Sequence, residues 1–249
     1  MEKSLGQRFD HGIWRLMFIT FEGGEGSGKS TQVRLLSERL VRHGCKVTMT
    51  REPGGTEDAE AVRNIFVSGE TGRWSSDEEL LLVSAARSNH LRNLIRPALL
   101  RGEIVICDRF IDSTYVYQVF AGTTEFDYFD KVSRHVIGET WPVKTFILDI
   151  DPVEGILRSR NRMAALKIAS EEYFTAGIEG LSQDALETSL KLSAASSEDR
   201  FERKDIKDHK KIREGFASLV QKFPDRCVLL DATKSPDILS DTIWQQING

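Results

Sequence analysis

The chain has 249 residues, of which 40% are hydrophobic and 29% charged, as is usual for a folded globular protein. This length allows one large domain or two small ones, and a large domain buries enough surface to fold without disulfides or structural metals. The net charge of −4 and the pI near 5.8 argue against nucleic acid or an anionic membrane as a partner, because binders of either use basic surfaces. No stretch approaches the roughly 18 apolar residues of a membrane span.

Cys45, Cys107 and Cys227 are scattered and form no C-x-x-C pair. Neither a disulfide framework nor a zinc site is expected, and a reducing cytoplasm fits this usage. Residues 1–15 contain no apolar core segment and are not a signal peptide. We expect them to be a disordered N-terminal extension, since Met17 could equally start the protein, and we assign residues 16–249 to one domain.

Short apolar runs alternate with stretches of helical periodicity along the chain. Strands are expected at Leu16–Phe21, Lys46–Thr50, Glu103–Cys107, Lys144–Ile150 and Arg226–Leu230. Helices are expected at Ser30–His43, Glu57–Val67, Asp77–Leu100 (with a kink near Pro97) and Phe126–Ile137. Strands with continuous apolar runs, separated by helices, predict an α/β fold with a doubly wound, five-stranded parallel sheet. Ligands bind such sheets at the carboxyl ends of the strands.

Residues 163–196 do not fit this alternation. They are rich in Ala, Ser, Leu and Glu and lack a strand pattern. We interpret them as an insertion that contains one or two short helices.

The strongest motif is Gly23–Ser30, with the sequence GGEGSGKS. It matches G-x-x-x-x-G-K-[ST], follows an expected strand and opens an expected helix, as a phosphate-binding loop does. Its glycines allow consecutive N–H groups to face one anion, and the helix N-terminus adds its positive dipole end. Lys29 is expected to reach the β- and γ-phosphates, and the Ser30 hydroxyl to bind Mg²⁺.

Two further motifs follow the second and third strands. Asp108 ends an apolar strand, where a carboxylate can hold the water shell of a metal, and the adjacent Arg109 suits bidentate capture of a phosphate. A surface salt bridge is the alternative for Arg109. The turn at Pro53-Gly54-Gly55 places Arg51 and Glu52 at the same sheet edge, beside the phosphate loop.

Three arginines follow Pro152, which is a suitable first residue of a helix. On that helix Arg158 and Arg162 share a face, whereas Arg160 points away. Arginines near a phosphate loop suggest a lid that neutralises a phosphoryl group in transfer. The alternative is a solvated basic face.

Taken together, these motifs resemble thymidylate kinases, which phosphorylate dTMP with ATP. The resemblance runs from Met17 to Trp244 apart from the insertion. It implies a fold of the P-loop nucleoside-monophosphate-kinase type, with a lid at about residues 158–204 enlarged by the insertion at about 163–196. Arginines in the lid and none in the loop match the bacterial type. The matching tracts are Glu22–Thr31, Thr50–Thr56, Asp108–Phe110 with Ser113-Thr114 and Tyr117-Gln118, and Asp199–Glu202.

The resemblance also implies roles for individual residues. Catalysis would involve Lys29, Arg109, Arg158 and Arg162. ATP would contact Gly23, Gly24, Glu25, Gly26, Ser27, Gly28, Lys29, Ser30, Thr31, Arg158, Arg200 and Ala232. The dTMP site would comprise Glu25, Arg51, Glu52, Pro53, Val83, Arg87, Arg109, Ser113, Thr114, Tyr117 and Gln118. Mg²⁺ would be held by Ser30 and, through water, by Asp108 and Glu52. A homodimer in the cytoplasm is implied as well, with the expected helices at Asp77–Leu100 and Phe126–Ile137 as candidate interface elements.

Within that set, Arg87 would contact the thymine edge opposite Thr114, and Tyr117 would exclude a 2′-hydroxyl. The chain departs from the family at Val83, where an aromatic ring usually lies under the base. Stacking on a base contributes roughly 1–3 kcal/mol, so we expect either weaker binding of the base or stacking by a neighbour such as Phe66 or Phe110.

Two other functions compete with this one. The first is a kinase for another nucleoside monophosphate. The second is a P-loop regulatory protein that hydrolyses a nucleotide without an acceptor, which would leave Arg87, Arg109 and the Ser113–Gln118 segment without a task. A GTP-dependent switch is disfavoured because the sequence has no N-K-x-D motif.

Overall fold

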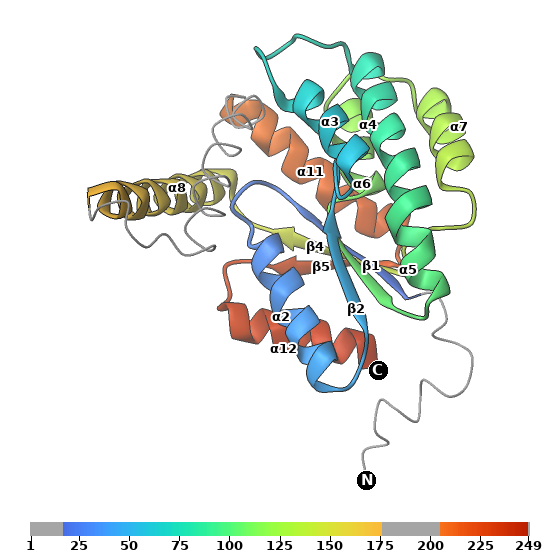
Figure 1. Cartoon of the computed structure of the whole chain (residues 1–249). Coiled ribbons are helices and arrows are strands. Elements are labelled where there is room, and N and C mark those ends of the chain that lie inside the picture. Colours follow the sequence, from blue (N-terminus) through green and yellow to red (C-terminus); the bar gives the residue numbers. More distant parts are fainter. Residues whose placement is uncertain (1–16, 176–204, 249) are drawn as a thin grey trace.

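The computed structural model describes residues 17–175 and 205–248, and its core is one five-stranded sheet (Figure 1). The strands are β1 (Phe18–Gly23), β2 (Val47–Arg51), β3 (Ile104–Asp108), β4 (Lys144–Asp149) and β5 (Cys227–Asp231). They are all parallel, in the order β2-β3-β1-β4-β5. The predicted doubly wound α/β sheet is therefore confirmed. The expected N-terminal extension and Arg200 lie outside the described residues.

The helices occupy the connections between these strands. They are α2 (Lys29–Arg42), α3 (Glu57–Val67), α4 (Ser76–His90), the π-helical turn η2 (Leu91–Ile95), α5 (Arg96–Leu100), α6 (Ile111–Thr114), the π-helical turn η3 (Tyr115–Phe120), α7 (Phe126–Ile137), α8 (Pro152–Thr175), α11 (Ile206–Lys222) and α12 (Pro236–Asn248). The bounds of α3 and α7 match the prediction. Within the two described ranges, no helix combines the length and apolar content that a membrane crossing requires.

Apolar side chains cover both faces of the sheet, as the continuous apolar strands predict. On one face, α2 and α12 pack against residues such as Phe21 and Phe146. On the other, α4, α5 and α7 pack around Phe18 and Val105, while α11 packs near Ile147. Figure 1 shows these two helical layers on opposite sides of the sheet. The sheet is thereby fixed on both faces, and its carboxyl edge remains available for a site.

The expected helix at Asp77–Leu100 has a more detailed form in the structure. It begins at Ser76 behind a capping box formed by Ser75 and Glu78, and it widens into η2 before continuing as α5. Pro97 lies in the first turn of α5. Proline lacks an N–H and its ring clashes with the preceding turn, so a widened π turn just before it accommodates the residue without ending the helix.

The helix α8 runs into the segment interpreted as an insertion. It begins at Pro152 as expected but continues through residue 163 to Thr175 as one helix of 24 residues. Residues 163–175 are thus helical, but as the continuation of a longer helix, and residues 176–196 lie outside the described part. Figure 1 shows α8 projecting from the body of the protein.

The first turn of α8 packs directly on the phosphate loop through two glycines. A Cβ at Gly26 would lie 1.9 Å from the carbonyl oxygen of Gly155, and a Cβ at Gly155 would lie 2.3 Å from that of Glu25. Gly26 also has a φ of 65°, which disfavours other residues. The loop and the lid helix can approach this closely only because neither residue carries a side chain.

We expect Gly155→Ala to destabilise the protein, because the added methyl group meets backbone that cannot rotate away. Overpacking costs about 1–3 kcal/mol, partly offset by about 1 kcal/mol of better helix propensity. Thermal and urea unfolding measure the change. Val153→Ala, at a side chain 59% exposed on the same turn, should change stability by less than about 0.5 kcal/mol. A Gly155→Ala protein at least as stable as the wild type would contradict the close contact.

Candidate active site

The phosphate loop joins β1 to α2 and holds Lys29 against its own backbone. The Lys29 ammonium group donates to the carbonyl oxygens of Gly23 at 3.2 Å and Gly24 at 2.8 Å. Its side chain is only 8% exposed. Burial lowers the pKa of Lys29 to about 8, and the nearby Arg109 guanidinium acts in the same direction. The loop thus has a buried cation at its centre, as a phosphate-binding loop requires.

Ser30 and Asp108 meet at the mouth of this loop. The Ser30 hydroxyl donates to the Asp108 Oδ2 atom at 2.7 Å. Strand β3 lies next to β1 in the sheet, which brings these residues together although they are 78 positions apart. Hydroxyl and carboxylate oxygens are ligands that suit Mg²⁺. The residues present therefore fit the expected metal.

Arg109 follows β3 in a strained conformation. Its φ is +67°, and it is the one described residue other than glycine with a positive φ. Its Nη1 atom donates to the Gly23 carbonyl oxygen and to the Ser113 Oγ atom, both at 3.0 Å. Burial disfavours its charge, but Tyr117 and nearby carboxylates outweigh that effect and raise its pKa. Because Gly23 accepts from both Lys29 and Arg109, one carbonyl separates the two cations.

A second group of polar residues lies around Arg87 on α4. Arg87 donates to Glu52 at 2.8 Å and to the Thr114 hydroxyl at 2.9 Å. The other carboxylate oxygen of Glu52 contacts His90 at 3.0 Å, and His90 in turn contacts Thr50. Arg87, Glu52 and Thr114 are all less than 5% exposed. Both Glu52 oxygens are engaged here, so its contacts do not support the expected metal role and instead tie Glu52 to Arg87.

A cavity of about 300 Å³ connects these groups. The expected site residues that line it are Glu25, Gly26, Ser27, Gly28, Lys29, Ser30, Thr31, Arg51, Glu52, Pro53, Val83, Arg87, Asp108, Arg109, Ser113, Thr114, Tyr117, Gln118 and Arg162. The expected residues Gly23, Gly24, Arg158 and Ala232 are not among its lining residues. Gly23 and Gly24 contribute through their carbonyl contacts with Lys29.

Some of these residues make further contacts that fix their positions. Arg51 pairs with Glu60 at 3.2 Å, and Gln118 donates to Glu79 at 2.8 Å. The guanidinium carbon of Arg109 lies 5.6 Å from the centre of the Tyr117 ring.

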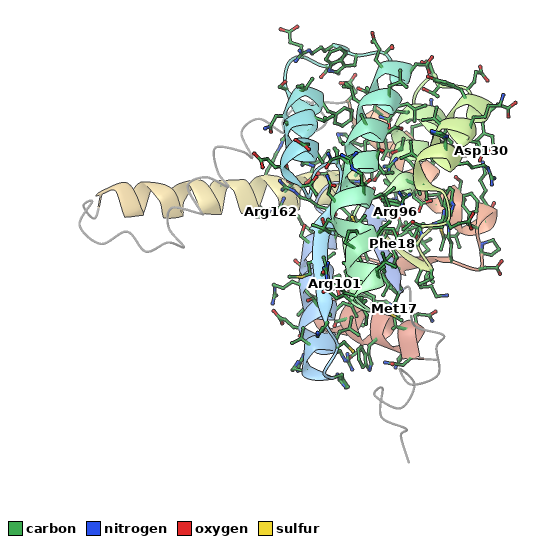
Figure 2. The ribbon with its side chains drawn as sticks, turned by 45° about the vertical axis from the view of Figure 1, so that its right-hand side comes forward. Met17, Phe18, Arg96, Arg101, Asp130 and Arg162 are labelled. Carbon is green, nitrogen blue, oxygen red and sulfur yellow. The ribbon has the colours of Figure 1, made fainter. Side chains whose placement is uncertain are left out.

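The lid arginines divide between two positions. Arg162 lies 3.6 Å from the Glu25 carboxylate and lines the cavity. Figure 2 shows Arg162 on α8 near the point where that helix leaves the body of the protein. Arg158 instead donates to the carbonyl oxygen of Ala232 at 2.9 Å. The structure thus brings together Arg158 and Ala232, which are both expected to contact ATP.

Glu25 is the carboxylate on which the cations around the loop converge. Burial raises its pKa, but Lys29, Arg109 and Arg162 outweigh burial and lower it below its usual value. The Ser159 hydroxyl adds a hydrogen bond of 3.3 Å to the same carboxylate. Glu25 is therefore ionised at neutral pH, and the cations around it come from the end of the loop, the turn after β3 and α8.

Sequence reasoning assigned no role to several residues of this region. Arg63 and Val67 line the cavity from the same face of α3 as Phe66, and their spacing along the helix that follows the Pro-Gly-Gly turn could have indicated them. Glu22 and His90 were missed because their partners lie far away in sequence. No local pattern reveals such contacts.

The fold and the site define a P-loop phosphotransferase with a second polar subsite facing the phosphate loop. The family model for thymidylate kinase matches residues 21–179. The chain is 39% identical to a thymidylate kinase of a Bradyrhizobium species, with 95% of this chain and 91% of that protein covered. It is 42% identical to a thymidylate kinase of Rhodopseudomonas palustris, with 92% and 87% covered.

A solved structure agrees with these sequence comparisons. The crystal structure of thymidylate kinase from Ehrlichia chaffeensis is similar to this fold, with a TM-score of 0.65 and 29% sequence identity, over 94% of this chain and 98% of that one. The chain therefore belongs to the thymidylate kinase family, and the resemblance found in its sequence motifs is confirmed.

The buried carboxyl group of Glu22 provides a test of the electrostatics beneath the site. Burial raises its pKa from 4.5 to about 7, and the nearby Asp112 carboxylate acts in the same direction. The folded state therefore holds this proton more tightly than the unfolded state, so ionisation of Glu22 lowers stability as the pH rises from about 4.5 to about 7. Glutamine cannot ionise. We expect the melting temperature of Glu22→Gln, relative to the wild type, to increase by several degrees between pH 5 and pH 8.

Differential scanning calorimetry at matched ionic strength measures this trend. Glu38→Gln, at an exposed ion pair on α2, controls for the general effect of losing a carboxylate. A difference between Glu22→Gln and the wild type that is constant across this pH range would contradict the raised pKa.

Proposed function

We propose that this chain transfers the γ-phosphoryl group of ATP to dTMP and releases ADP and dTDP. The observation that carries the proposal is the single cavity shared by the phosphate loop and the Arg87 group. One side offers a P-loop lysine for a triphosphate, and the other offers arginines and hydroxyls for a second nucleotide. Membership of the thymidylate kinase family supports dTMP as that nucleotide.

On the donor side, we assign the ATP phosphates to the loop residues Gly23–Thr31, with Lys29 at the β- and γ-phosphates. Arg158 and Ala232 are proposed to lie beside the adenine, and their mutual hydrogen bond supports this assignment. Arg200 keeps the lid role that the resemblance implies. Ser30 directly, and Asp108 through water, would hold Mg²⁺. The ion would supply positive charge that offsets the negative charge of the phosphates.

On the acceptor side, Arg109 and Arg51 are proposed to bind the dTMP phosphate. Arg87 and Thr114 would hydrogen-bond the thymine edge, and the Glu52 carboxylate keeps Arg87 in place. Ser113, Gln118 and Pro53 complete this side, with Tyr117 against the deoxyribose and Glu25 near its 3′-hydroxyl.

The reaction then needs little covalent chemistry from the protein. An oxygen of the dTMP phosphate attacks the γ-phosphorus, the bond from that phosphorus to the β,γ-bridging oxygen breaks, and ADP leaves with the electron pair. The attacking oxygen is already anionic, so no general base is required. Lys29, Arg109 and Arg162 supply positive charge around the transferring group, and positioning with charge neutralisation provides most of the rate enhancement.

We further propose that the enzyme is a homodimer in the cytoplasm. Exposed apolar side chains on α4, α5 and α7 support an interface there. They include Leu81, Leu100, Phe126 and Tyr128, each at least 38% exposed. A patch of exposed apolar side chains on one side of a protein is typical of an interface.

Acceptor specificity tests the proposed function directly. We expect dTMP to have the highest kcat/KM in a panel with dUMP, dCMP and dGMP, measured with ATP and Mg²⁺ by formation of the nucleoside diphosphate. Lys29→Ala, purified in parallel, should lose at least about a thousandfold in kcat because it removes the phosphate-binding cation, and it controls for contaminating kinases. A better acceptor than dTMP would assign the cavity to another nucleoside monophosphate, and hydrolysis of ATP alone would remove the acceptor site from the proposal.

Phe66 is expected to support the thymine ring, because this chain has Val83 where the family usually has an aromatic residue. It packs with Val83 and lines the cavity. The alternative, Phe110, has the Arg87 guanidinium 4.9 Å from its ring centre and the Phe18 ring edge-on at 4.9 Å. We expect Phe66→Leu to raise the Kd for dTMP about fivefold or more, because stacking on a base contributes roughly 1–3 kcal/mol.

Isothermal titration with dTMP and with a non-hydrolysable ATP analogue measures both affinities. Phe223→Leu, at an exposed ring that does not line the cavity, serves as the matched control. Unchanged dTMP affinity in Phe66→Leu would show that this ring does not support the base.

A further inference from the structure

Glu22 is a buried carboxylate at the end of β1 that takes no part in the proposed chemistry. It immediately precedes the phosphate loop, its side chain is 0% exposed, and it is not among the residues that line the cavity. A buried carboxylate is costly unless hydrogen bonds or opposite charges compensate it. The contacts of Glu22 show where that compensation comes from.

Among the described residues, Glu22 accepts hydrogen bonds from the segment that follows β3. The Glu22 Oε1 atom accepts from the backbone N–H groups of Phe110 at 2.8 Å and Ser113 at 3.2 Å. Its Oε2 atom accepts from the Ser113 hydroxyl at 2.5 Å. One side chain from β1 therefore binds both ends of a four-residue segment that begins just after Arg109.

That segment determines the direction of the Arg109 side chain. The backbone at Arg109 is in the left-handed region, at a φ of +67°, which costs a non-glycine residue energy unless the surroundings hold it there. The Ser113 Oγ atom, while donating to Glu22, accepts from the Arg109 Nη1 atom at 3.0 Å. Glu22 is thus connected to Arg109 in two ways, through the backbone of Phe110 and through the hydroxyl of Ser113.

We propose that Glu22 is a positioning residue for the acceptor subsite. Its side chain is long enough to hydrogen-bond the turn at Arg109 and hold it in the conformation that binds the phosphate of dTMP. The inference rests on the proposed function, because Arg109 is assigned to the acceptor phosphate there. Glu22 touches neither nucleotide in this scheme.

The neighbouring carboxylate, Asp112, does a different task. Both of its oxygens accept from the Arg226 guanidinium at 2.7 Å, and Oδ2 also lies 3.4 Å from the Thr145 hydroxyl. These contacts join α6 to the start of β5 and involve no atom of Arg109. Asp112 is as buried as Glu22, at 2% exposed, which makes it a matched control for removing a buried carboxylate next to the site.

Two substitutions at Glu22 separate the effect of side-chain length from the effect of charge. Glu22→Gln loses the charge but keeps an oxygen that can accept from the N–H groups of Phe110 and Ser113. Its amide nitrogen can donate to the Ser113 Oγ atom. Glu22→Asp keeps the charge but withdraws the oxygens by one methylene. We expect Glu22→Asp to raise KM for dTMP about tenfold with KM for ATP within twofold of the wild type. Glu22→Gln is expected to keep KM for dTMP within about threefold.

Asp112→Asn is the control for general damage to the buried cluster. It should lower the melting temperature but leave KM for dTMP within about threefold. The positioning role is overturned if Glu22→Asp leaves KM for dTMP unchanged, if it raises KM for ATP equally, or if Asp112→Asn raises KM for dTMP as much. It is also overturned if Glu22→Gln impairs dTMP binding as strongly as Glu22→Asp, since charge and not side-chain length would then matter.

The wild type distinguishes this inference from the proposed function. Should the wild-type protein fail to phosphorylate dTMP, the proposed function fails. Should it phosphorylate dTMP while Glu22→Asp behaves like the wild type, only the role of Glu22 is lost.

Discussion

The site depends on holding several positive charges close together in a partly buried cavity before any phosphate arrives. Two polyanionic nucleotides can meet only where cations offset their repulsion, yet those cations repel one another. The effect is visible at Lys29, whose pKa falls to about 8 through burial and the neighbouring Arg109. The structure offsets this cost with oxygen atoms: the Gly23 carbonyl lies between Lys29 and Arg109, and the Glu52 carboxylate holds Arg87.

The strand order makes this arrangement possible. Strands β2, β3 and β1 are adjacent and parallel, so the segments that follow their carboxyl ends meet along one edge. The phosphate loop follows β1, Arg51 and Glu52 come from the end of β2 and the turn after it, and Arg109 follows β3. The proposed triphosphate and acceptor sites therefore arise from three neighbouring loops. The helices on the two faces hold the strands in register and contribute Arg87 from α4.

Sequence patterns predicted the strands and the phosphate loop because these features are local. An apolar run, a glycine motif and a Pro-Gly-Gly turn each carry their structural reason within a few residues. The π-helical turn η2 lies in an expected helix and was not predicted, since it differs from an α-helix only in spacing. Over η3 no helix was expected. The contacts of Glu52 differed from expectation for another reason: its partners, Arg87 and His90, lie 35 and 38 residues further along the chain. Buried charges find such partners only in the folded state.

The cations that surround Glu25 are the ones proposed to bind the phosphates. Its carboxylate is kept ionised by Lys29, Arg109 and Arg162, which are cations proposed to face phosphate oxygens during transfer. Glu25 therefore supplies these cations with negative charge of the kind that the proposed substrates would also supply. Because α8 packs closely on the loop at Gly155 and Gly26, Arg162 on α8 is held next to Glu25 in the loop. An incoming phosphate then meets cations that are already gathered, and little reorganisation remains for the moment of reaction.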